Sequence, residues 1–218
     1  MCIRDRIDTI IFDLDGTLLN TLEDLQDSTN FALKEFGYQE RNIEEIRLFV
    51  GNGVAKLIER AIPQGLDNPN FEKCLAIFKK HYAENMYNKT APYAGIIEML
   101  TKLKLNGYKT AVVSNKFDAA VKELCKKYFG DLINIAIGES ENVRKKPAPD
   151  SVIRAMQELK SPKENCIYCG DSDVDVQTAK NTRIECIGVT WGFRDYENLN
   201  TAGAKYIINA PADILKLI

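Results

Sequence analysis

The sequence predicts an α/β fold built on a parallel sheet, with an all-helical insertion between its first two strands. Short β-branched, apolar runs alternate with segments of helical periodicity over most of the chain. The stretch from Thr21 to Tyr108, about ninety residues, contains no candidate strand. Because a crossover between parallel strands needs only about a dozen residues, the excess predicts a separate helical part.

Six short runs are candidate strands, and most are apolar throughout, as is typical of parallel strands buried on both faces. They span residues 7–12, 110–113, 133–137, 166–169, 184–190 and 206–208. Between them, apolar residues recur at helical spacing, as in Ile96, Leu100 and Leu103. We expect Asp118 and Asp150 to act as N-caps of the helices after the second and third strands.

Three apolar stripes at helical spacing lie within the insertion, at residues 22–36, 54–61 and 71–86. They predict a helical unit over residues 20–90, inserted into a sheet domain made of residues 7–19 and 91–218. We interpret the stripes as ordinary helix-core packing.

Composition excludes several classes of protein. The 29 Lys and Arg against 31 Asp and Glu give a net charge of -2, which argues against a nucleic-acid binder. No apolar run reaches the ~18 residues that span a bilayer, and no secretory signal is visible, so we expect a cytoplasmic protein without a membrane partner. With His81 as the one histidine, a metal site built from several histidines is excluded within one chain. The six cysteines, including the pair Cys166 and Cys169, are interpreted as reduced core thiols.

Polar residues gather where the predicted strands end, and ligands of open α/β sheets bind beyond the carboxyl ends of the strands. The first strand is followed by Asp13 and Asp15, the second by Ser114 and Asn115, the third by a loop with Lys145 and Lys146, and the fourth by Asp171, Asp173 and Asp175. Clustered carboxylates repel one another unless a cation offsets their charge. An all-oxygen set without His or Cys suits Mg²⁺, which also binds substrate phosphate.

Four segments, FDLDGTLLNT, VVSN, KKPAPD and CGDSDVD, resemble in this order the four motifs of the haloacid dehalogenase-like (HAD) superfamily. The resemblance covers the chain from Ile7 onward. It implies a Rossmann-like parallel sheet core, the HAD fold, with the insertion as a helical cap. The segments FVGNGVAKLIERAI and PYAGIIEML are similar to the phosphoglycolate phosphatases of that superfamily. Residues 1–6 (MCIRDR) do not fit the family pattern, and we interpret them as non-native.

The resemblance implies a role for each motif residue. Asp13 is expected to attack phosphorus and form an aspartyl-phosphate, while Asp15 first protonates the leaving alcohol and then activates water. Mg²⁺ is expected at the side chains of Asp13 and Asp171 and the backbone carbonyl of Asp15. Asp175 is expected to act on the metal indirectly, through one of its ligands or through a water molecule. Ser114 and the Asn115 backbone are expected to bind phosphate oxygens, and Lys146 to neutralise charge on Asp13 and the phosphoryl group. Lys116 and Lys145 are expected at the surface.

The acid at position 15 also indicates the reaction class, because the family's dehalogenases lack an acidic residue there. The resemblance therefore implies a Mg²⁺-dependent phosphatase for a small phosphorylated metabolite, with 2-phosphoglycolate as the first candidate.

A mutase of the β-phosphoglucomutase kind and another sugar-phosphate phosphatase remain open as alternatives. A phospho-receiver domain fits less well, because receivers are about half this length and carry their phosphorylated Asp on a later strand; a catalytically inactive relative has no support, since every motif residue is present. The protein is expected as a monomer or homodimer.

Selectivity is expected from the insertion, which should close over the core as a lid. There the turn Gly51-Asn52-Gly53 precedes a helical stripe that carries Lys56 and Arg60 one turn apart. Free backbone N–H groups at such a turn can bind an anion such as a substrate carboxylate. Lys56 and Arg60 are equally well explained as solvated surface cations. With Asn52 and Gly53 they form the candidate specificity set for a small, doubly anionic substrate.

Overall fold

The computed structural model describes residues 7–218 and divides into two compact units. One unit comprises the chain up to Leu19 together with Pro92–Ile218, and the other is Asn20–Ala91. The expected non-native segment, residues 1–6, lies outside the described residues. Where the chain passes between the units, the short strands β2 (Leu19–Asn20) and β3 (Ala91–Pro92) pair as a two-stranded sheet.

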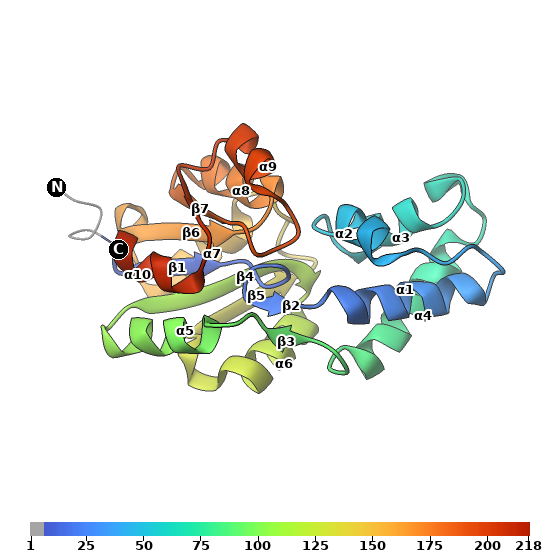
Figure 1. The fold of residues 1–218 in the computed structure, drawn as a ribbon, viewed down its shortest axis with the longest axis horizontal. Helices are drawn as coiled ribbons and strands as arrows, with labels where there is room; N and C mark the ends of the chain where they lie inside the picture. Colours follow the sequence, from blue (N-terminus) through green and yellow to red (C-terminus); the bar gives the residue numbers. More distant parts are fainter. Residues whose placement is uncertain (1–6) are drawn as a thin grey trace. The chain divides into compact units, whose positions relative to one another are not determined.

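The first unit is built on a six-stranded sheet in the order β5-β4-β1-β6-β7-β8. Figure 1 labels all of these strands except β8. Every adjacent pair of strands is parallel, which confirms the predicted fold class. The strands are β1 (Thr9–Phe12), β4 (Lys109–Phe117), β5 (Ile135–Glu139), β6 (Cys166–Gly170), β7 (Glu185–Val189) and β8 (Tyr206–Ile208). The central strands β1 and β6 are buried at every position, as their continuous apolar sequences predict.

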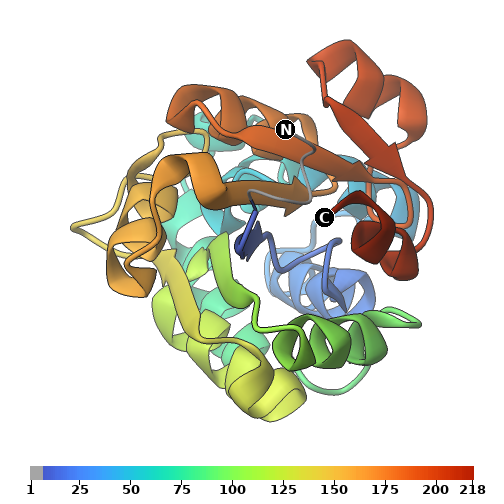
Figure 2. The ribbon, with the colours of Figure 1, turned by 90° about the vertical axis from the view of Figure 1, so that its left-hand side faces the viewer.

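Helices cover both faces of this sheet (Figure 2). They are α5 (Ile96–Leu105), α6 (Asp118–Phe129), α7 (Asp150–Leu159), α8 (Asp173–Thr182), α9 (Tyr196–Ala202) and α10 (Ile214–Leu217). Helices α7, α8 and α9 bury Val152, Val176 and Leu199 in one hydrophobic cluster with Ile11 and Tyr168 of the sheet. This cluster fixes β1 and β6, the two strands that carry most of the acidic residues discussed below.

Strand register sets which residues of β4 and β6 lie level with the end of β1, and β4 continues past that level to Phe117. Phe12, the last residue of β1, is paired with Val112 of β4 and with Cys169 of β6. The ladder continues one step further, because the Asp13 N–H donates to the carbonyl of Cys169 at 2.9 Å. Asp13, Ser114 and Asp171, which lie one or two residues beyond these paired positions, therefore meet at the carboxyl edge of the sheet.

Three local predictions are corrected. The third strand begins at Ile135, two residues later than predicted, because Asn134 instead accepts hydrogen bonds from the backbone and hydroxyl of Thr110. Asp118 is the first residue of α6, and its carboxylate accepts from the Gly138 N–H of β5 at 2.9 Å. Asp150 is likewise inside its helix, where it accepts from Arg144. Neither acid therefore caps its helix.

The second unit contains four helices: α1 (Leu22–Lys34), α2 (Ile43–Phe49), α3 (Val54–Ala61) and α4 (Phe71–Asn85). Its core includes Leu25, Leu57, Phe78 and Tyr82, which come from the predicted stripes. The buried carboxylate of Asp24, in the first turn of α1, accepts the N–H groups of Lys89 and Thr90. These hydrogen bonds join the first and last segments of the unit.

Candidate active site

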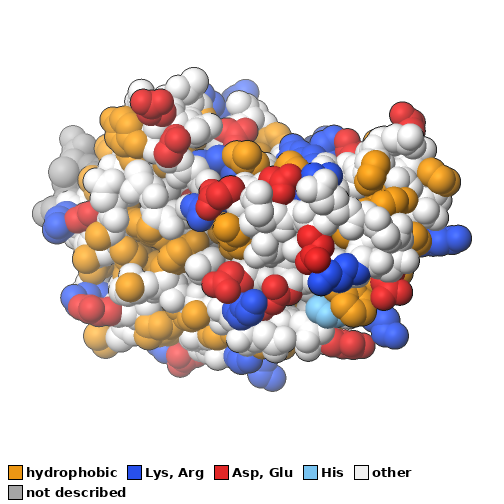
Figure 3. Space-filling view, turned by 45° about the vertical axis from the view of Figure 1, so that its right-hand side comes forward, with side chains coloured by type: hydrophobic (Ala, Val, Ile, Leu, Met, Phe, Trp, Pro, Cys, Tyr) orange, Lys and Arg blue, Asp and Glu red, His pale blue; other side chains and the backbone are white. Residues whose placement is uncertain are grey.

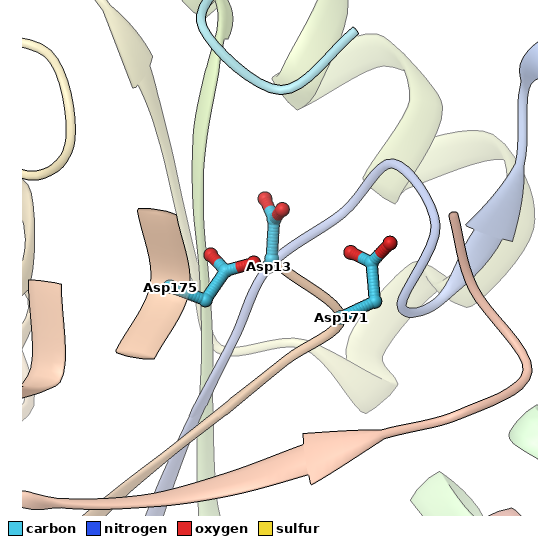
Figure 4. A group of neighbouring side chains, drawn as sticks. All are labelled: Asp13, Asp171 and Asp175. Atoms are coloured by element: carbon cyan, nitrogen blue, oxygen red, sulfur yellow. The ribbon is translucent and has the colours of Figure 1, made fainter. Parts of the chain in front are cut away.

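Three buried carboxylates, those of Asp13, Asp171 and Asp175, lie together at the carboxyl edge of the central strands. Their oxygen atoms come within 4.8 Å of one another. Figure 4 shows Asp13 between Asp175 and Asp171. Asp13 follows β1, Asp171 follows β6, and Asp175 lies in the first turn of α8. The structure thus brings together three of the acids that the sequence singled out, while Asp173 beside them is exposed.

Asp13 is held by two donors on the same oxygen. Its Oδ1 accepts the Leu14 N–H at 2.7 Å and lies 2.8 Å from the ammonium of Lys146. Burial, and then the negative charge of Asp175, raise the pKa of Asp13 well above its usual range, although Lys146 opposes this. Asp13 is therefore a buried carboxyl group with a fixed orientation, and its ionised form needs additional positive charge nearby.

Lys146 bridges two of the acids. Its Nζ contacts Asp175 Oδ1 at 2.8 Å as well as Asp13, and it donates to the Tyr168 hydroxyl at 3.1 Å. Burial alone would lower the pKa of Lys146, but the charges of Asp13 and Asp175 raise it, so the side chain stays cationic. Its backbone is fixed by Asn115, whose side-chain amide donates to the Lys146 carbonyl and accepts the Lys146 N–H.

Asp175 is saturated by protein donors. Its Oδ2 accepts the N–H and hydroxyl of Ser172, and its Oδ1 accepts from Lys146 and from the Tyr168 hydroxyl at 3.0 Å. The Asp175 side chain can lie against the end of β6 because residue 170 is glycine; a Cβ there would lie 2.4 Å from the Asp175 carboxyl carbon. This arrangement favours an orienting role for Asp175 over direct metal ligation.

Asp171 is oriented by the loops around it. Its Oδ1 accepts from the Thr17 hydroxyl at 3.1 Å and its Oδ2 from the Phe193 N–H at 2.7 Å. Gly16 has φ of 85°, and a Cβ there would lie 2.3 Å from Asp171 Oδ2, so a side chain is excluded on both grounds. Burial, and then the charge of Asp175, raise the pKa of Asp171 to about 7.

The donor set fits a divalent cation. Three buried carboxylates face one another, and Lys146 supplies one positive charge to two of them. Burial and mutual repulsion raise the pKa of both Asp13 and Asp171, as expected where a bound cation would stabilise the ionised forms. Hard oxygen ligands without His or Cys suit Mg²⁺.

Lys116 contradicts its expected surface position. Only 2% of its side chain is exposed, and its Nζ lies 3.1 Å from Asp15 Oδ1. Ser114, two residues earlier on β4, is also buried, and its hydroxyl accepts the Lys116 N–H. Residues two apart on a strand share a face, so this spacing was the sequence signal that could have placed Lys116 at the site. Lys145, in contrast, is exposed as expected.

Tyr168 and Thr17 are site residues that sequence reasoning missed. Tyr168 sits within the apolar run of β6, where a tyrosine is indistinguishable from core packing, and its hydroxyl nevertheless contacts both Lys146 and Asp175. Thr17 lies in the first motif, yet its contact with Asp171 depends on a residue 154 positions away.

The candidate specificity residues lie around the turn between α2 and α3. Gly53 precedes α3 with φ of 85°, and no side chain caps that helix. Arg60 donates to the Phe49 carbonyl at 2.7 Å and to Asn52 Oδ1 at 3.0 Å, so it fastens the turn. Lys56 pairs with Glu59 at 2.5 Å.

On the face drawn in Figure 3, acidic and basic side chains are interspersed and do not form a basic patch. Among the helices of residues 7–218, none combines the length and apolar content that crossing a bilayer requires.

Comparison with known proteins agrees with this geometry. The family model for haloacid dehalogenase-like hydrolases matches residues 10–189. A phosphoglycolate phosphatase from Aquifex aeolicus is 32% identical over 96% of this chain and 95% of its own length, and one from Pseudomonas putida is 31% identical over 92% and 75%. A crystal structure from Lactobacillus delbrueckii subsp. bulgaricus, provisionally described as a phosphoglycolate phosphatase, is 33% identical and superposes with a TM-score of 0.92 over 96% of this chain and 97% of its own.

The sheet unit carries the four motifs at one sheet edge, where buried Lys146 contacts Asp13 and Asp175 and the carboxylate of Asp171 lies within 4.8 Å of both acids. The chain belongs to the haloacid dehalogenase-like hydrolase family and is a phosphatase.

Proposed function

We propose that the protein hydrolyses the phosphomonoester of a small metabolite, 2-phosphoglycolate, through an aspartyl-phosphate on Asp13. The observation that carries the proposal is the contact of Asp13 Oδ1 with Lys146 inside a buried cluster of acids. A carboxylate fixed in this way is a positioned nucleophile beside a cation that can offset the charge of a phosphoryl group.

In the first step, a carboxylate oxygen of Asp13 forms a bond to phosphorus while the bond to the leaving alcohol oxygen breaks. Asp15 gives its proton to that oxygen, so a neutral alcohol departs. In the second step, Asp15 takes a proton from water as the water oxygen attacks phosphorus. The bond between phosphorus and Asp13 then breaks, which releases phosphate and restores the carboxylate.

The other site residues act by binding and positioning. Ser114 and the Asn115 backbone would bind phosphoryl oxygens, and the Asn115 side chain holds the backbone of Lys146. Asp13, Asp171 and the Asp15 carbonyl would hold Mg²⁺, with Asp175 orienting Lys146 from behind. When bound, Mg²⁺ offsets negative charge on the phosphoryl group and the carboxylates. We place this reaction in the cytoplasm.

Three observations support phosphoglycolate as substrate. The relatives above bear that name. The family resemblance extends through the insertion, and the α2–α3 turn offers an uncapped helix start with Lys56 on the same helix. Such a turn can receive a carboxylate.

A panel of phosphorylated metabolites tests the proposal. With Mg²⁺ present, we expect phosphate release from 2-phosphoglycolate at a higher kcat/KM than from glycerol phosphate or hexose phosphates. Faster hydrolysis of hexose phosphates would refute the substrate assignment. Conversion of a hexose 1-phosphate to its 6-phosphate without phosphate release would indicate a mutase and refute the hydrolytic assignment.

A further inference from the structure

The site contains a second buried lysine whose role the mechanism above does not use. Lys116 lies near the end of β4 with 2% of its side chain exposed. Burying an ammonium group is costly unless a charged partner compensates. Lys116 forms an ion pair with Asp15, the residue that the proposed mechanism uses as acid and base.

The two buried lysines contact different carboxylates. Lys146 contacts Asp13 and Asp175, and Lys116 contacts Asp15 at 3.1 Å. Asp15 Oδ1 is buried and accepts no hydrogen bond among the described residues. The contact with Lys116 is therefore a charge pair that lacks hydrogen-bond alignment, and it is what holds this oxygen in place.

The backbone of Lys116 is set by close packing. A Cβ on Gly138 of β5 would lie 2.6 Å from the Lys116 carbonyl oxygen and 2.5 Å from the Asp118 Cα. Strand β5 can thus approach the end of β4 only because residue 138 is glycine. The Lys116 N–H is also fixed, since it donates to the Ser114 hydroxyl at 3.2 Å. The ammonium group is consequently presented from a rigid strand end.

We propose that Lys116 is a positioning residue for Asp15. Its ammonium holds Oδ1, so that the other carboxyl oxygen is directed to the leaving-group oxygen, and it stabilises the carboxylate that remains once Asp15 has given its proton away. This inference rests on the proposed function, in which Asp15 is the acid.

Leaving-group dependence distinguishes this role from a merely structural one. An alkyl phosphate needs a proton on its departing oxygen, whereas p-nitrophenolate departs without one. Because kcat/KM reports the steps up to release of the alcohol, it isolates the acid function. For Lys116→Met we expect kcat/KM to fall about tenfold or more with 2-phosphoglycolate and with ethyl phosphate, and much less with p-nitrophenyl phosphate. Lys122→Met, which removes an exposed lysine paired with Asp118, is the matched control and should change none of the three.

Three comparisons decide the interpretation. If the loss occurs with 2-phosphoglycolate but not with ethyl phosphate, Lys116 recognises the substrate carboxylate and the inference is wrong. An equal loss with all three substrates also contradicts it. In an Asp15→Asn background, Lys116→Met should add no further loss with alkyl phosphates; a full additional loss would show that Lys116 acts independently of Asp15.

Thermal unfolding establishes that Lys116→Met is folded at the assay temperature. Should it not fold, Lys116→Arg, which keeps the charge but displaces it, should show the same shift in leaving-group dependence in smaller measure; an unchanged ratio would overturn the inference. Failure of the proposed function is recognised separately, because the wild-type protein would then release no phosphate from any of the three substrates. If the wild-type protein turns over all three substrates but both Lys116 variants keep its leaving-group dependence, the inference about Lys116 is wrong and the proposed function still stands.

Discussion

At the scale of single residues, the site is a set of shared contacts. Lys146 is fixed by Asp13, Asp175 and Tyr168 at its ammonium group and by Asn115 at its backbone. Asp171 is fixed by Thr17 and Phe193. Lys146 and Asp171 are therefore each held in part by neighbours that have no role in bond making, which limits the reorganisation needed during the reaction.

Asp171→Asn tests the metal assignment. The amide loses the negative charge but keeps the size of the side chain, so the Mg²⁺ concentration that gives half-maximal activity should rise about tenfold or more. Asp173→Asn is the matched control, because this neighbouring acid is exposed and outside the cluster; its Mg²⁺ requirement should stay that of the wild type. EDTA should inhibit both proteins and Ca²⁺ should not replace Mg²⁺. Undiminished turnover in metal-free buffer would refute the assignment.

At the scale of elements, strand ends and helix starts position the chemistry. The register of β1 against β4 and β6 brings Asp13 level with the segments that carry Ser114 and Asp171. This arrangement was predictable from apolar runs that end in polar residues. The close approaches of Gly138 and Gly170 to neighbouring segments were not, because they depend on contacts between segments distant in sequence.

The α2–α3 turn gives the prediction at this scale. Lys56→Met should raise KM for 2-phosphoglycolate more than for p-nitrophenyl phosphate, because only the former has a carboxylate. Arg60→Met should do the same by a different route, since it removes the hydrogen bonds to Phe49 and Asn52 that fasten the turn. Lys79→Met, which alters an exposed position of α4, is the control. Equal KM changes for both substrates would exclude a role of this turn in carboxylate recognition.

At the scale of the whole molecule, the sequence predicted the parallel sheet, and its motifs singled out Asp13, Asp171 and Asp175, which the structure brings together. It did not predict the buried position of Lys116, because a lysine near a strand end reads as a surface residue unless its strand face is considered. Nor did it distinguish Tyr168 from core packing. Both depend on the tertiary placement of charges.

Stability should depend on pH and Mg²⁺ together. The folded-state pKa of Asp171 is about 7, and that of Asp13 is also raised, whereas an unfolded aspartate has a pKa of about 4. In the metal-free folded state these two acids therefore bind more protons than they do in the unfolded state in this range, so their contribution to the free energy of unfolding falls as pH rises from about 4 to about 7. Mg²⁺ binds the ionised acids and offsets this loss.

Thermal unfolding with and without Mg²⁺ measures this linkage. The increase in Tm that Mg²⁺ produces should be larger at about pH 8 than at about pH 5. In Asp171→Asn the increase should be smaller and depend less on pH. An increase that is the same at both pH values, or larger at the lower one, would contradict the assignment of these acids to the metal site.

The central claim is that Asp13 carries the phosphoryl group, and trapping the intermediate tests it most directly. Enzyme quenched during turnover and reduced with borohydride should yield, after proteolysis, a peptide in which residue 13 has become homoserine, since borohydride reduces an acyl phosphate. The Asp13→Asn variant, once a thermal unfolding transition has shown that it is folded, should yield no reduced residue and release no phosphate. Phosphate release by Asp13→Asn, or a reduced residue at any position other than 13, would contradict the account.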